Sequence, residues 1–96
     1  MEQICKVDIC GIAGVVNEQK IGENRVLRIS VAVNENYGSS VHTNWFQVVW
    51  WPEKSDTRTF GRGDIIHAEG RLISNEYTNP QGETCRVYEI KAQKIW

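Results

Sequence analysis

The stretch that decides the fold is VLRISVAVN, residues 26–34. Its apolar side chains stand at every second position, at Leu27, Ile29, Val31 and Val33, with polar or small side chains between them. Because successive side chains of a β-strand point to opposite faces, this period of two indicates a strand with one face in a core. The other face is available to solvent or to a ligand.

Four other segments have the composition of strands, and clusters of turn-forming residues separate them. These expected strands run from Ile4 to Val16, from Trp45 to Trp51, from just after Gly63 to Tyr77, and from about Thr84 to Trp96. The first contains Gly11 and Gly14, and glycines inside a strand predict a bulge or bend of the kind that a small barrel needs in order to close. The chain is therefore expected to be all-β.

The connections between these strands are polar or contain glycine and proline. Turns are expected at residues 22–24 and 79–82, and a polar loop at residues 35–44. A proline ends the third strand, and residues 52–62 fit either one short helix or an irregular link. Three strands, a short link and a two-stranded hairpin is the order of the five-stranded Greek-key OB barrel. We expect one OB-fold domain over residues 1–96, with a sandwich of another topology as the alternative.

Aromatic side chains are concentrated in the third expected strand. Of the four tryptophans in the chain, Trp45, Trp50 and Trp51 lie there. Alternation puts Trp50 on one face with Phe46 and Val48, whereas Trp45 and Trp51 share the other face. Either the strand is buried on both sides, or one aromatic face is exposed for binding. We expect Trp50 in the core and the other two tryptophans on a binding face.

Charge and cysteine content narrow the class of protein. The chain has 11 Lys and Arg against 12 Asp and Glu, which gives no electrostatic indication of a nucleic-acid partner. Three cysteines without a Cys-x-x-Cys spacing fit neither a disulfide framework nor a zinc site, so reduced thiols are expected. No signal peptide and no apolar run near the ~20 residues of a membrane span are present. We expect a soluble cytoplasmic protein, and so short a chain is also expected to associate into an oligomer.

The strands contain three short motifs. They are CGIAG at residues 10–14, TNWFQVV at residues 43–49 and GDIIHAEGRL at residues 63–72. Together with residues 26–33, they resemble the bacterial single-stranded DNA-binding protein family, whose motifs are Val-Gly-x-Leu-Gly, Thr-Glu-Trp-His-Arg-Val-Val and Gly-x-x-Val-x-Val-Glu-Gly-x-Leu. The resemblance covers nearly the whole chain. It implies an OB-fold that binds single-stranded DNA largely without sequence preference, in DNA replication, recombination or repair.

The resemblance also implies a set of binding residues. The family stacks bases on aromatic side chains, and the matching positions here are Tyr37, Trp45, Trp51 and Tyr77. Stacking accepts any base and is worth ~1–3 kcal/mol per base. The candidate phosphate contacts are Lys6, Arg28, Arg62 and Arg71. The alternatives are turn anchoring for the two tyrosines, and core or subunit-interface packing for the two tryptophans.

The sequence also departs from the family. Basic positions near the last stacking aromatic are Ile73, Asn75 and Glu76 here, which predicts fewer phosphate contacts and a shallower salt dependence. The family's acidic-tipped tail, which recruits partner proteins, has no counterpart in this sequence, which fits either a naturally short relative, as from a phage or plasmid, or a truncated chain. The family's assembly suggests a homotetramer, with a dimer as the next possibility.

Two other functions remain open. One is an OB-fold protein-interaction module of a replication or primosome complex that binds DNA weakly, which the charge of −1 favours. The other is an RNA-binding OB domain of cold-shock type. An enzyme is not expected, because no phosphate-binding loop or nucleophile elbow is present, and His42 and His67 have no partner at ligand spacing. No catalytic residue, metal or cofactor is therefore expected.

Overall fold

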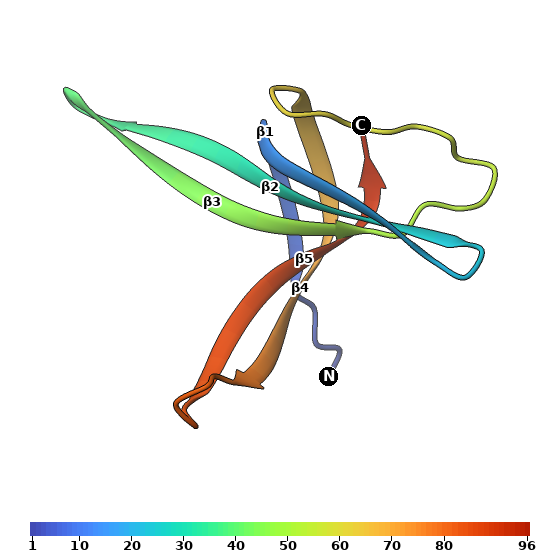
Figure 1. The fold of residues 1–96 in the computed structure, drawn as a ribbon. Coiled ribbons are helices and arrows are strands. Elements are labelled where there is room, and N and C mark those ends of the chain that lie inside the picture. Colours follow the sequence, from blue (N-terminus) through green and yellow to red (C-terminus); the bar gives the residue numbers. More distant parts are fainter.

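Five strands make up the structure, a computed structural model that describes residues 1–96 (Figure 1). They are β1 (Lys6–Ile21), β2 (Asn24–Tyr37), β3 (Ser40–Trp50), β4 (Ile65–Thr78) and β5 (Thr84–Ile95). Their order around the closed barrel is β1-β2-β3-β5-β4, and only β3 and β5 pair in parallel. This is the five-stranded barrel expected from the sequence. The structure contains no helix of the length and apolarity needed to cross a membrane.

The core of the barrel is the apolar face that the period of two predicts. Leu27, Ile29 and Val31 of β2 are completely buried. All five strands contribute to the central cluster, which consists of Ala13, Leu27, Ile29, Val31, Val48, Trp50, Ile66, Ala68, Ile90, Ala92 and Ile95. No polar or charged side chain is buried with them. Burial of apolar area at ~25 cal/mol per Å² therefore supplies the main stabilisation of the barrel.

β1 bends in the middle, as its glycines predict. It pairs with β4 from Lys6 to Ile12 and with β2 from Ile12 to Ile21. The register with β2 shifts between Ala13 and Val16, which marks a bulge. Because β1 bends there, it pairs with β4 before the bend and with β2 after it, and this closes the barrel.

The expected polar loop at residues 35–44 is wrong, because β2 and β3 continue through it as a paired hairpin. Their pairing runs out to Tyr37 and Ser40, and Gly38 closes the turn with a φ of 60°. Polar side chains on the hairpin satisfy one another across the strands: the Thr43 hydroxyl donates to the Asn34 amide oxygen at 2.7 Å. Ladder hydrogen bonds and such cross-strand pairs hold a strand that has no apolar face.

Two arms extend from the barrel, and Figure 1 shows them diverging. β3 and β5 pair only at residues 48–50 and 90–92, so the two hairpins separate beyond that point. We call residues 33–47 the β2–β3 arm and residues 73–89 the β4–β5 arm.

The connection from β3 to β4 is irregular and contains no helix, so the second of the two expected alternatives is right. Two arginines fix this link. The Arg25 guanidinium donates to the carbonyl oxygens of Asp56 at 2.9 Å and Arg58 at 3.0 Å. Arg58 in turn donates to the carbonyl oxygen of Ile95 at 2.7 Å and lies over the Trp50 ring. Side-chain donors thus bond carbonyls that have no ladder partner.

Candidate nucleic-acid interface

The outer face of β3 presents two exposed tryptophans. Trp45 is 62% exposed, and Trp51, directly after the strand, is 44% exposed. Trp50, which has the opposite phase, is 5% exposed and packs edge-on against Phe60. The burial expected for Trp50 and the exposure expected for Trp45 and Trp51 are therefore confirmed, and binding by the two exposed rings stays a prediction. Trp51 follows Trp45 by six positions, so at a rise of about 3.3 Å per residue their Cα atoms are about 20 Å apart along the chain.

Small neighbours position the Trp45 indole against the barrel. Ala32 of β2 lies directly opposite Trp45 in the register. A Cβ atom on Gly14 of β1 would lie only 2.8 Å from the Trp45 ring, so glycine leaves the space in which the ring rests. One side of the Trp45 ring thus packs on the β1 bulge, and the rest of the ring is exposed to solvent.

Tyr77 continues the same outer face along the β4–β5 arm. It lies opposite Cys85, and Arg71 lies opposite Lys91 further along the same pair of strands, so that Tyr77 is an even number of positions from Arg71 and has the same phase. The Tyr77 side chain is exposed, and its hydrogen bond with the Cys85 side chain is the main cause that raises the pKa of the phenol above its usual value. Tyr77 therefore remains a neutral aromatic ring at physiological pH.

Tyr37 lies on the opposite face of the β2–β3 arm from Trp45. Alternation along β2 places it in phase with the core residue Val31, whereas Ala32, opposite Trp45, has the other phase. Its hydroxyl donates to the Glu35 carboxylate at 2.5 Å, and its ring meets His42 edge-on with centroids 6.3 Å apart. Of the four expected stacking residues, Trp45, Trp51 and Tyr77 are exposed on the outside of the barrel and its arms, whereas Tyr37 has the phase of the core side chains.

Four basic side chains form a row across the outer face. The register places Arg28 of β2, Val49 of β3, Lys91 of β5, Arg71 of β4 and Lys6 of β1 side by side. We call the four basic members of this series the basic row. Arg28 is 3.6 Å from the Glu89 carboxylate, and the other three members make no ion pair. Three of them were expected from the sequence.

Lys91 is the member that the sequence analysis missed. Its place in the row depends on the parallel pairing of Val49 with Lys91, which joins segments more than 40 residues apart. The only available signal was the alternation of β5, in which Ile90 and Ala92 are buried and Lys91 points outward. That signal marks an exposed lysine but does not indicate its neighbours.

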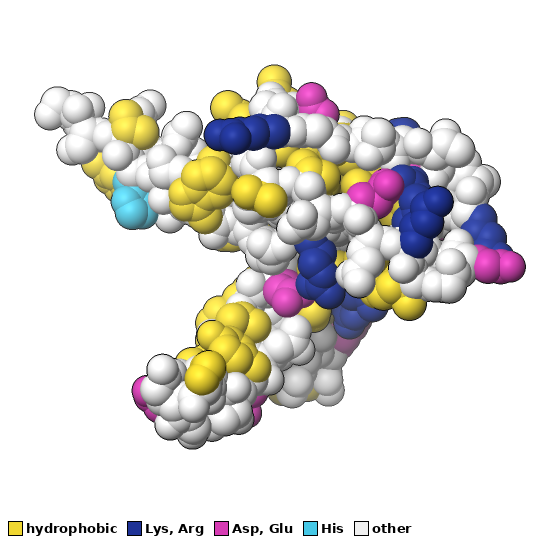
Figure 2. Space-filling view, viewed as in Figure 1, with side chains coloured by type: hydrophobic (Ala, Val, Ile, Leu, Met, Phe, Trp, Pro, Cys, Tyr) yellow, Lys and Arg dark blue, Asp and Glu magenta, His cyan; other side chains and the backbone are white.

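Arg62 lies outside the basic row, near the β1 bulge. The next residue, Gly63, donates to the Ala13 carbonyl oxygen at 2.9 Å, beside the Gly14 that supports Trp45. Figure 2 shows hydrophobic side chains on both arms and Lys or Arg side chains where the arms meet the barrel. The surface thus combines exposed aromatic rings with exposed basic side chains.

The His, Cys, Asp and Glu side chains form one close pair and no cluster that could hold a metal ion. No group of three or more His, Cys, Asp or Glu side chains is placed to hold a metal ion. His67 has no partner at ligand spacing in the sequence, but it has a neighbour in space: its Nε2 lies 2.6 Å from the Asp8 carboxylate, and the centroids of the His67 and Trp96 rings are 4.0 Å apart. Sequence spacing does not show the pair with Asp8, because the two residues are 59 positions apart and meet only on neighbouring strands.

Fold and surface together define an OB-fold barrel with an aromatic and basic outer face. Residues 5–96 match the sequence model of the Single-strand binding protein family, and the chain belongs to that family. The resemblance seen in the sequence motifs is thereby confirmed.

One sequence relative and one solved structure are similar to this chain. A single-stranded DNA-binding protein of Malacoplasma penetrans is 29% identical over 94 residues, which are 94% of this chain and 49% of that protein. The chain thus spans about half the length of this relative. The solved structure described as Plasmodium falciparum SSB complex with ssDNA matches with a TM-score of 0.77 and 16% identity, over 99% of this chain and 93% of that one. At that identity the match establishes the fold.

Proposed function

We propose that this protein binds single-stranded DNA, largely without sequence preference, on the outer face of β3. The observation that carries the proposal is the pair of exposed indoles, Trp45 and Trp51, on one face of a strand that the basic row crosses. Stacking a base on an exposed indole is favourable, and every base has a flat face that can stack. Membership of the family supports the same function.

The row crosses β3 at Val49, between the two tryptophans. A DNA strand that runs along β3 and stacks on both rings therefore passes its phosphates between Arg28 and Lys91. Tyr77 stacks a further base on the β4–β5 arm, and Tyr37 contributes less because it faces the other way. If all four members of the row contact phosphates, the slope of log K against log salt is about −2.8, at about −0.7 per phosphate.

The proposal extends to assembly and to cellular role. The chain acts as a single OB-fold domain in a homo-oligomer, a tetramer or else a dimer. Ile12 and Ile65 support self-association, because they are exposed and lie directly opposite each other on the outer side of β1 and β4. The protein coats DNA in the cytoplasm during replication, recombination or repair, without catalysing a reaction.

The test is a titration of intrinsic tryptophan fluorescence with oligo-dT at low and moderate salt. We expect strong quenching that saturates at a fixed number of nucleotides per protomer, because the bases stack on exposed indoles. The absence of quenching at low salt, with the protein folded, would reject the proposal. The function to test next is then an OB-fold protein-interaction module, which the charge of −1 favours.

A further inference from the structure

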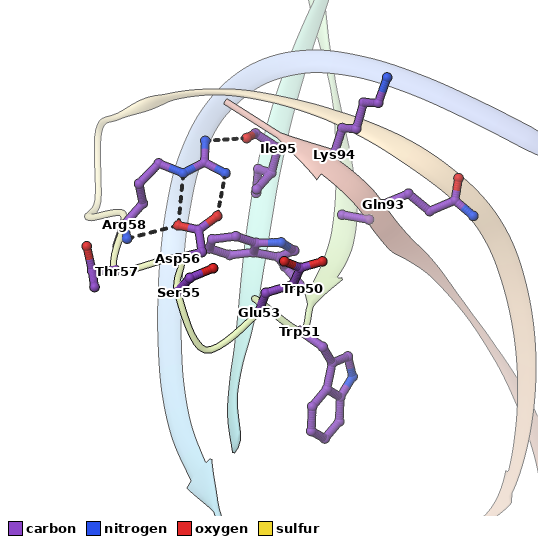
Figure 3. Close-up of a pocket in the computed structure, with 11 residues that line it drawn as sticks. Trp50, Trp51, Glu53, Ser55, Asp56, Thr57, Arg58, Gln93, Lys94 and Ile95 are labelled. Carbon is purple, nitrogen blue, oxygen red and sulfur yellow. Dashed lines mark hydrogen bonds and ion pairs between the residues drawn. The ribbon is translucent and has the colours of Figure 1, made fainter. Parts of the chain in front are cut away.

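A pocket opens at the end of the barrel where β3 and β5 finish. Its volume is about 890 Å³, within the ~300–1,000 Å³ of small-molecule sites. It lies between the irregular link and the last residues of β5, and Trp51 is among its lining residues. Figure 3 shows the Trp50 ring beside Asp56 and the Trp51 ring turned away from Arg58 and Ile95. The pocket is therefore continuous with the proposed DNA-binding face.

The link side of the pocket holds one ion pair, between Arg58 and Asp56, and one unpaired carboxylate, that of Glu53. Both guanidinium ends of Arg58 are used, by the Asp56 carboxylate at 2.8 Å and by the Ile95 carbonyl oxygen at 2.7 Å. Hydrogen bonds from Arg58 hold the pKa of the Asp56 carboxyl below its usual value, so this ion pair persists at neutral pH. The wall therefore keeps its shape without a ligand.

The remaining rim carries polar side chains with no partner inside the chain. Ser55 on the link, and Gln93 and Lys94 on β5, line the pocket and make no side-chain hydrogen bond or ion pair. Glu69 lies opposite Lys94 in the register but beyond ion-pair distance. Ala92 and Ile95 add apolar surface. These side chains match a ligand that has a flat apolar ring, polar edges and a nearby anionic group.

We propose that this pocket receives the nucleotide that follows the base stacked on Trp51. The proposal rests on the proposed function, since the occupant is the DNA strand already bound along β3. A strand that leaves Trp51 at the end of β3 meets the pocket next, because Trp51 belongs to both surfaces. Lys94 contacts the phosphate, Gln93 and Ser55 bond the edge of the base, and the ring packs on the apolar surface beside Trp50.

Two substitutions test the pocket without touching the stacking residues. Ser55→Trp fills it with a large side chain, and Lys94→Gln removes its cation. Lys20→Gln is the matched control, because Lys20 is an exposed lysine without an ion pair on the β1–β2 hairpin, away from the pocket. Binding to oligo-dT is followed by fluorescence, which gives the affinity, the nucleotides bound per protomer and the salt slope.

We expect Ser55→Trp to lower the number of nucleotides per protomer by at least one. Lys94→Gln is expected to reduce the salt slope by about 0.7, the contribution of one single-strand phosphate, and Lys20→Gln to leave it unchanged. If Ser55→Trp does not fold, the slope of Lys94→Gln carries the test, together with a shift of the Gln93 side-chain amide in NMR spectra when oligo-dT is added to the unsubstituted protein.

Two results would overturn the proposal, and they differ in what they leave standing. If both variants bind like the unsubstituted protein while its fluorescence is quenched, the pocket stays empty and binding on the outer face stands. If oligo-dT does not quench the unsubstituted protein at all, the proposed function fails and the pocket proposal fails with it.

Discussion

Replacing Trp45 with alanine separates binding from folding, because the indole is largely open to solvent. At 62% exposure the side chain buries roughly 60–95 Å², and we expect Trp45→Ala to lower the free energy of unfolding by about 1.5–2.5 kcal/mol. The loss of a stacked base costs ~1–3 kcal/mol of binding free energy. At about 1.4 kcal/mol per tenfold change, the dissociation constant for oligo-dT rises by about 5- to 150-fold.

The assay is fluorescence anisotropy of a labelled oligo-dT, with thermal denaturation of the same samples to verify the fold. Tyr37→Ala is the control, because it removes an equally exposed aromatic ring from the opposite face of the same arm. Its effect on affinity should be smaller than that of Trp45→Ala. A folded Trp45→Ala protein whose dissociation constant stays within about twofold of the original would refute base stacking at this position.

Three further substitutions test the fold, the basic row and the link. Gly70→Ala should destabilise the barrel by about 3 kcal/mol in chemical denaturation, because its Cβ would lie 2.0 Å from the Lys91 carbonyl oxygen. Lys91→Gln should reduce the salt slope of oligo-dT binding by about 0.7. Asp56→Asn should flatten the loss of thermal stability at acid pH. The pKa of Asp56 is lower folded than its usual 3.8, chiefly through the hydrogen bond from Arg58, so the folded state binds fewer protons. The carboxylate therefore stabilises the fold above its unfolded pKa, and this contribution is lost as the pH falls through the folded value.

Each of these three tests has a result that would contradict it, and the first also has a control variant. Gly61→Ala should be nearly neutral, since the nearest atom to its Cβ would be 3.9 Å away, and equal destabilisation by both alanines would argue against a steric cause. A salt slope that Lys91→Gln leaves unaltered would remove Lys91 from the DNA path. An acid transition that is the same with and without Asp56 would mean that its ion pair does not stabilise the fold.

Alternation along single strands predicted much of this structure. The period of two in residues 26–34 identified Leu27, Ile29 and Val31 as buried and Arg28 as pointing outward, although Val26, which has the phase of Arg28, is buried as well. The same reasoning separated buried Trp50 from exposed Trp45 and Trp51. These predictions succeed because the direction of a side chain in a strand depends on local backbone geometry and on one buried face.

Features that depend on pairing between distant segments were beyond the sequence. The polar composition of residues 35–44 indicated a loop, because nothing in it shows that two strands continue to pair outside the core. Because a loop gives its residues no defined phase, alternation assigned Tyr37 to neither face, and the family resemblance alone grouped it with Trp45. Lys91 and the Asp8–His67 pair were missed for the same reason, since each acquires its neighbour only when remote strands meet.

The divergence of the two arms leaves backbone hydrogen-bonding groups without a partner strand. Residues 40–47 of β3 pair with β2 on one side and with no strand on the other, because pairing with β5 begins only at Val48. Such an open edge can pair with a strand of another molecule and start aggregation. The polar side chains of this segment, among them His42, Thr43 and Asn44, make it a poor template for a growing intermolecular sheet. The polar composition that predicted a loop instead of a hairpin thus also limits aggregation through the open edge of β3.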